Sequence, residues 1–201
     1  MPIAFRIIIG TCVLIELVLT AATLAGYPAL RQGAFLLGGF FPQLMGHWTG
    51  IYPGQAVGMF ATYGFLHAGL LHLGMNMVAL AQLLRELARI MTAHAMLAVY
   101  AVSQVGAGLA QGVLAPHGPV MVGASGAIFG LAGALLARGY VATRRRRLAM
   151  GPLAQSALTL LVLNVALALL VPQIAWQAHL GGFITGAAMG VAQALMRPRR
   201  A

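Results

Sequence analysis

Long apolar runs separated by short polar or charged segments dominate this chain. They occupy roughly residues 5–26, 60–84, 91–114, 122–142, 153–171 and 178–196. Each run has about the 20 residues that an α-helix needs to cross the hydrocarbon core of a bilayer. The pattern therefore predicts an all-α membrane protein with six transmembrane helices, whose ends are placed to within about four residues. We expect residues 1–201 to form a single domain.

The segment between the first two runs, residues 27–59, is long and almost uncharged. Its prolines and glycines oppose a regular span. Its aromatic rings suit the headgroup region of a membrane; they are Phe40, Phe41, Trp48 and Tyr52. We expect a loop half-submerged in the membrane surface, and an ordinary ordered loop is the alternative.

Composition agrees with this interpretation, because 61% of the residues are hydrophobic and 7% are charged, which is typical of membrane proteins. The run from Ile7 to Gly26 is longer than the apolar part of a signal peptide. We therefore interpret it as an uncleaved first helix. Cys12, the single cysteine, rules out an intramolecular disulfide.

The arginines predict the orientation. With the N-terminus in the cytoplasm, eleven of the twelve arginines face inward and only Arg31 faces outward. Positive charge gathers on the cytoplasmic side of membrane proteins, so we expect both termini in the cytoplasm and the protein in the cell membrane, the inner membrane of a bacterium. The net charge of +10 is then directed at anionic lipid rather than nucleic acid.

The scarcity of acids excludes several chemistries. The chain has no aspartate, and Glu16 and Glu86 are its only acids. The chain lacks the residues needed for proteolysis by two aspartates, for glycoside hydrolysis by paired carboxylates and for carboxylate-rich Mg²⁺ or Ca²⁺ sites. A serine nucleophile would have to work with histidine alone or with another orienting group. Glu16 lies inside the first run and must face protein or water; we expect it to make a structural bond.

Polar side chains at membrane depth are functional candidates, because burying them in lipid is costly. The second run contains His67, His72 and Asn76, the fourth opens with Ser125, and the sixth opens with His179. The prolines before Ser125 make a regular helix unfavourable there. Ser125 would then stand at a helix N-terminus, where free amide N–H groups favour the anion of an acyl-transfer intermediate.

Small residues recur every four positions after Ser125 and after His179. Such faces let membrane helices approach closely; they comprise Gly126 and Gly130 on one run and Gly182, Gly186 and Gly190 on the other. If the faces meet, Ser125 and His179 lie at the same end of the contact, and histidine can accept the serine proton. A packing role for Ser125 alone is the alternative. His72 and Asn76 share one helix face and can donate to an oxyanion.

Three motifs in this order resemble the rhomboid intramembrane serine proteases, in their bacterial six-helix form. They are TYGFLHAGLLHLGMN on the second run, Gly123-Ala124-Ser125-Gly126 on the fourth, and Ala178-His179-Leu180-Gly181-Gly182 with Gly186 on the sixth. The resemblance covers essentially the whole chain. It implies six helices around a water-filled cavity, with a half-submerged first loop.

The resemblance also implies an activity and its residues. Ser125 would be the nucleophile and His179 the general base, and His72, Asn76 and the Ser125 amide would stabilise the oxyanion. Gly123, Gly126 and Phe129 would support the site, with the Phe129 ring against His179. Apart from the resemblance, we interpret His67 as a structural, hydrogen-bonding histidine, with a catalytic role as the alternative. Substrates would be single-span membrane proteins cut near the outer end of their span, with no cofactor and no metal. The fifth helix and the loop Val171–Gln177 would gate substrate entry.

The sequence departs from the family in two respects and leaves two other function classes open. Four residues before His67, where some relatives carry a basic residue or histidine, this chain has Tyr63. Many relatives carry a Trp-Arg pair just before the second helix, whereas this chain has PGQAVGMFATYGF there, so the anchor of the first loop is unexplained. An inactive member that binds membrane segments without cutting them is one alternative. A proton or metal transporter is the other; it would predict paired repeats, which we do not find.

Overall fold

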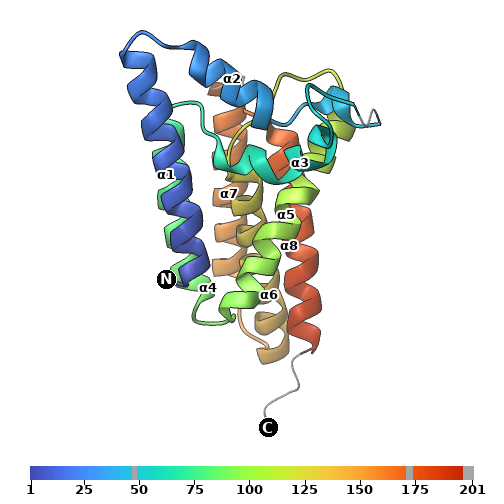
Figure 1. Cartoon of the computed structure of the whole chain (residues 1–201). Helices are drawn as coiled ribbons and strands as arrows, with labels where there is room; N and C mark the ends of the chain where they lie inside the picture. Colours follow the sequence, from blue (N-terminus) through green and yellow to red (C-terminus); the bar gives the residue numbers. More distant parts are fainter. Residues whose placement is uncertain (47–48, 171–173, 197–201) are drawn as a thin grey trace.

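The computed structural model describes residues 1–46, 49–170 and 174–196, and within these ranges the regular elements are helices (Figure 1). Trp48, residues 171–173 of the predicted gate loop and the arginines after Met196 lie outside the described residues. In chain order the elements are α1 (Ile3–Leu24), α2 (Ala29–Gly38), η1 (Pro42–Leu44), α3 (Gln55–Thr62), η2 (Tyr63–Phe65), α4 (Leu70–Leu87), α5 (Ala93–Leu114), α6 (Ser125–Arg146), α7 (Gly151–Leu170) and α8 (Trp176–Met196).

Six long helices, α1 and α4 to α8, run side by side along the molecule, while α2 and α3 lie across one end (Figure 1). This arrangement confirms the predicted all-α bundle. By length and composition α1, α5 and α6 can each cross a membrane, and the bent pair of α3–η2 with α4 makes a fourth candidate span. α8 is not among these candidates, but it packs against α6 along its length and therefore reaches the same depth.

The prediction of one continuous helix over residues 60–84 was wrong. The chain turns by 83° between η2 and α4, and α4 begins only after Gly69. Gly69 has a φ of +122°, a conformation that residues with a side chain rarely adopt. His67 therefore lies in the connecting turn and not on the helix that carries His72.

The first loop is largely helical, and a buried ion pair anchors it. Arg31 on α2 donates to both carboxylate oxygens of Glu16 on α1, at 2.7 and 3.0 Å. It also donates to the carbonyl of His67 at 3.1 Å and to Thr20. The Glu16 side chain is fully buried. The predicted structural bond of Glu16 is thus present, and it fixes the loop to α1 and to the turn before α4.

The glycine faces of α6 and α8 meet as predicted. A Cβ added to Gly182 would collide with the carbonyl oxygen of Gly126, and one added to Gly186 would collide with that of Gly130. The backbones of the two helices are therefore in direct contact. On the other side of α6, a core of large apolar side chains joins α1, α4, α5 and α6; it includes Phe5, Leu80, Leu84, Met96, Tyr100 and Leu131.

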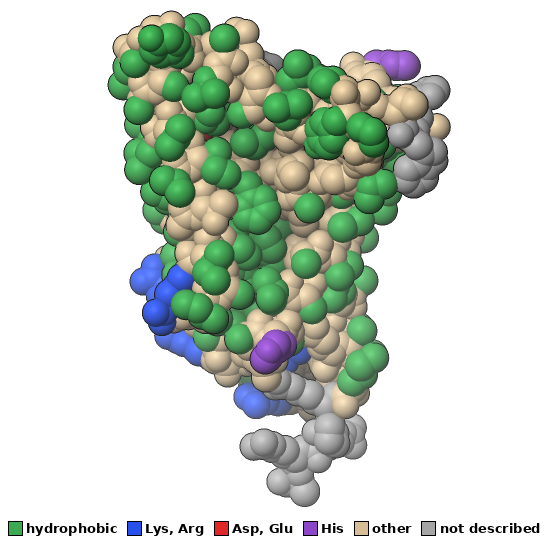
Figure 2. Space-filling view, in the orientation of Figure 1, with side chains coloured by type: hydrophobic (Ala, Val, Ile, Leu, Met, Phe, Trp, Pro, Cys, Tyr) green, Lys and Arg blue, Asp and Glu red, His purple; other side chains and the backbone are tan. Residues whose placement is uncertain are grey.

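Two features of the surface bear on orientation and on α7. Arg side chains gather at the end of the molecule where α1 begins, whereas apolar side chains are spread over the rest of the visible face (Figure 2). α7 stands at the edge of the bundle beside α6 and α8. A groove of about 520 Å³ lies between α7, α6 and α4.

Candidate active site

The chain that leads into α6 is held by backbone hydrogen bonds although it is not helical. Met121 and Phe40 exchange two N–H···O bonds, each 2.9 Å long, and Gly123 donates to the carbonyl of Tyr63 at 2.9 Å. The Tyr63 hydroxyl in turn donates to the carbonyl of Gln104 on α5 at 2.7 Å. Irregular backbone inside a membrane needs such partners. Together these bonds fix where α6, and with it Ser125, begins.

Ser125 and His179 are brought together at the start of the α6–α8 contact. Ser125 Oγ lies 2.9 Å from His179 Nε2, which is hydrogen-bonding distance. The imidazole stacks on Phe129, with ring centroids 4.3 Å apart and planes inclined by 12°. Its other nitrogen, Nδ1, lies 2.8 Å from Asn164 Oδ1 on α7. His179 is buried and Ser125 is partly exposed. The imidazole is therefore fixed by its neighbours, while the serine hydroxyl stays accessible to a substrate.

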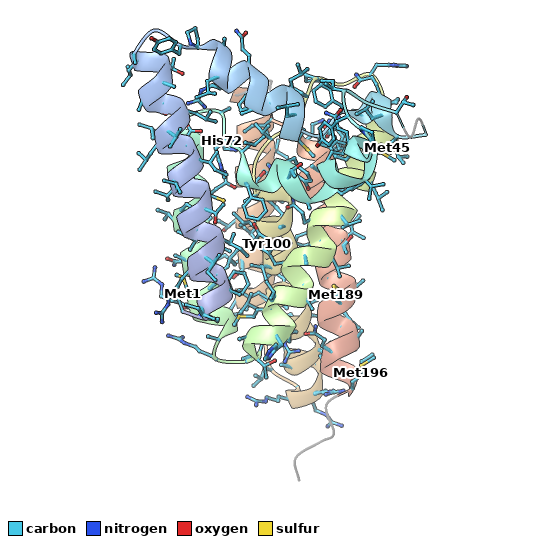
Figure 3. All side chains as sticks on the ribbon, viewed as in Figure 1. Met1, Met45, His72, Tyr100, Met189 and Met196 are labelled. Carbon is cyan, nitrogen blue, oxygen red and sulfur yellow. The ribbon has the colours of Figure 1, made fainter. Side chains whose placement is uncertain are left out.

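His72, labelled in Figure 3, presents a donor on the Ser125 side. The amide of Ala68 donates to His72 Nδ1 at 3.3 Å, so the hydrogen of the neutral ring is on Nε2. A Cβ added to Gly123 would lie 3.0 Å from that nitrogen and 3.8 Å from Ser125 Oγ. Because Gly123 has no side chain, the space between the imidazole and the hydroxyl stays open. Its φ of +126° also favours glycine.

Asn76 and His67 both lie beside His72. Asn76 Nδ2 donates to the carbonyl of His72 at 2.8 Å, which leaves the second amide hydrogen available. His67 is fully buried, and the backbone of Phe65 is within hydrogen-bonding reach of its ring. Its ring contacts His72 edge-on, at a centroid distance of 5.2 Å. The hydrogen bond to the Phe65 backbone fits the interpretation of His67 as a structural, hydrogen-bonding histidine.

Two residues at the site were missed by the sequence analysis. Asn164 is an amide within the fifth apolar run, the same kind of signal that singled out Asn76. Tyr63 lies in the motif of the second apolar run, but no role at the site was predicted for it. In the described ranges of the chain, no three His, Cys, Asp or Glu side chains are grouped so that they could hold a metal ion.

Comparison with known proteins places the chain in a family. Residues 53–195 match the family described as Rhomboid domain. The chain belongs to the rhomboid family. It is therefore a multi-pass membrane protein with the helical bundle of that family.

Two curated relatives were also found. Rhomboid protease GluP of Bacillus subtilis (strain 168) is 32% identical over 133 residues, which cover 64% of this chain and 25% of that protein. RHOMBOID-like protein 5 of Arabidopsis thaliana is 33% identical over 139 residues, which cover 67% of this chain and 43% of that protein. The matched region is thus less than half the length of either relative.

Proposed function

We propose that this protein is an intramembrane serine endopeptidase in which Ser125 is the nucleophile and His179 the general base. The observation that carries the proposal is the 2.9 Å approach of Ser125 Oγ to His179 Nε2 across two different helices. Membership of the rhomboid family and the similarity to a relative named as a protease support it.

The chemistry follows from these two side chains. The serine oxygen attacks the carbonyl carbon of the peptide bond while its proton passes to His179 Nε2. The imidazolium then gives that proton to the leaving amine, and the C–N bond breaks to leave an ester on Ser125. Water, deprotonated by the same nitrogen, hydrolyses the ester and restores both groups. No carboxylate side chain is required as a reacting group.

Three donors on the described chain suit the oxyanion. The amide of Ser125 is in the first turn of α6, where N–H groups have no acceptor within the helix. His72 adds its Nε2–H, and Asn76 adds its remaining amide hydrogen. Donors fixed in advance where negative charge develops are worth about 10²- to 10³-fold each in kcat. Gly123 keeps the space between His72 and Ser125 open for the substrate carbonyl.

The position of the site suggests the substrates. Ser125 lies at the end of α6 away from the arginines of its last turn. With the arginine-rich end in the cytoplasm, Ser125 lies toward the outer side of the membrane. We propose that the substrates are single-span membrane proteins cut near the outer end of their span, that both termini are cytoplasmic, and that the protein resides in a bacterial inner membrane.

The experiment uses the full chain in detergent or in liposomes, with a fluorophosphonate probe and a single-span model substrate. The chain has three serines, Ser103, Ser125 and Ser156, so the labelled residue can be identified by mass spectrometry. Ser125→Ala and His179→Ala should abolish both labelling and cleavage. The control Ser156→Ala removes an exposed hydroxyl that bonds only within α7 and should leave both unchanged.

Two results would refute the proposal. One is cleavage by Ser125→Ala at the wild-type rate. The other is a folded wild-type protein that neither labels nor cleaves, which would instead favour an inactive binder of membrane segments.

A further inference from the structure

We propose that Asn164 is a positioning residue that holds the imidazole of His179 in the tautomer required of a general base. This inference rests on the proposed protease function. Asn164 Oδ1 lies 2.8 Å from His179 Nδ1, and Ser125 Oγ lies 2.9 Å from His179 Nε2. The three side chains come from α7, α8 and α6, so one ring is bonded on both edges by two different helices.

The tautomer decides whether the ring can act as a base. A neutral imidazole carries one hydrogen, on one of its two nitrogens. When Nδ1–H donates to the carbonyl oxygen of Asn164, Nε2 keeps its lone pair and can accept the proton of Ser125. In the other tautomer Nε2–H points at the serine oxygen, and the serine proton has no acceptor. An oxygen at Asn164 therefore selects the reactive form.

Phe129 cannot make this selection by itself. It stacks on the face of the ring and fixes the ring plane. A half turn of the imidazole about its Cβ–Cγ bond leaves the plane unchanged but brings a carbon to the position of each bonded nitrogen. Only a partner at the ring edge distinguishes these orientations, and Asn164 is at that edge.

The chain offers no carboxylate for this position. Its only acids are Glu16 and Glu86, and these pair with Arg31 and Arg89. The amide of Asn164 supplies an acceptor without adding a charge to a membrane helix, where an unpaired carboxylate would be costly. The orienting role that a carboxylate has in other serine proteases is thus assigned here to a neutral side chain.

Kinetics give the first test. Asn164→Ala should lower kcat for the model substrate by about 10- to 100-fold, the effect of losing one hydrogen bond to a group that becomes charged, with KM changed less than threefold. Asn164→Asp, which keeps an oxygen at the same reach, should retain at least ten times the kcat of Asn164→Ala. The control Thr23→Val removes a hydroxyl that bonds within α1, away from the site, and should leave kcat unchanged.

Histidine ¹⁵N spectroscopy gives a second test that does not need activity. In the Ser125→Ala protein the His179 signals, assigned by their loss in His179→Gln, should show hydrogen on Nδ1. Adding Asn164→Ala should shift them toward a mixture of tautomers. A kcat for Asn164→Ala within twofold of wild type, or unchanged His179 signals, would overturn the proposal. So would equal losses in the Ala and Asp variants, which indicate a structural role. If the proposed protease function itself is wrong, a different result shows it: the Ser125→Ala variant still cleaves the model substrate.

Discussion

The buried ion pair between Glu16 and Arg31 yields a quantitative prediction. Glu16 is fully buried, and the Arg31 side chain is 20% exposed. Removing one partner of a buried pair leaves an uncompensated charge and costs about 3–5 kcal/mol. We therefore expect Glu16→Gln and Arg31→Met each to lower the free energy of unfolding by that amount. Arg31→Met should cost more, because the stranded carboxylate has no route to water, whereas a stranded arginine can extend toward the surface.

The double variant separates the charge effect from loss of packing. Glu16→Gln with Arg31→Met leaves no charge unpaired, so most of the loss should be recovered and the coupling energy should exceed about 2 kcal/mol. Reversible unfolding in mixed micelles, followed by circular dichroism, measures all four proteins. Glu86→Gln is the matched control, because its pair with Arg89 is exposed and such pairs are worth at most about 1 kcal/mol. Single-variant losses below 1 kcal/mol, or losses that simply add, would refute the reasoning.

Two further predictions concern glycines. Gly186→Ala places a methyl group against the carbonyl of Gly130, and overpacking of this kind lowers stability by about 1–3 kcal/mol. Because the methyl group separates α6 from α8, fluorophosphonate labelling should slow at least tenfold. In the control Gly10→Ala the added methyl group meets no atom within 4 Å, so stability should change by no more than about 1 kcal/mol and labelling should be unchanged. Equal behaviour of these two variants would contradict the role of the helix contact. Gly123→Ala should abolish cleavage, because its Cβ would lie 2.9 Å from the His72 ring in a strained backbone conformation; wild-type turnover measured on the model substrate would show that the space beside His72 is not used.

The sequence was most informative where a local pattern has a single structural outcome. Apolar runs of about 20 residues predicted the six long helices, because length and hydropathy alone decide whether a segment can span a bilayer. The four-residue spacing of Gly182 and Gly186 predicted the close contact with α6, because a helix face made of small residues has no side chains that would hold the two backbones apart.

Other features depend on how distant segments meet. The turn at Gly69 was missed because His67, Ala68 and Gly69 interrupt an apolar run too briefly to change its hydropathy. Arg31 and Glu16 were each conspicuous, one as the single outward arginine and the other as an acid within a span, but only the fold shows that each is the partner of the other. Asn164 was missed because spacing along the chain does not say which helix α7 faces.

The backbone contact between α6 and α8 has a consequence for the response to lipid. Helices adjust their tilt when bilayer thickness changes, and a helix held at the edge of a bundle is freer to do so than one whose main chain touches its neighbour. Thinner or thicker bilayers should therefore reorient α7 while the spacing between the serine and imidazole, set by two backbones in contact, stays the same. Membrane composition would then act on the orientation of the imidazole, through Asn164 on α7, while its distance from the serine oxygen is preserved.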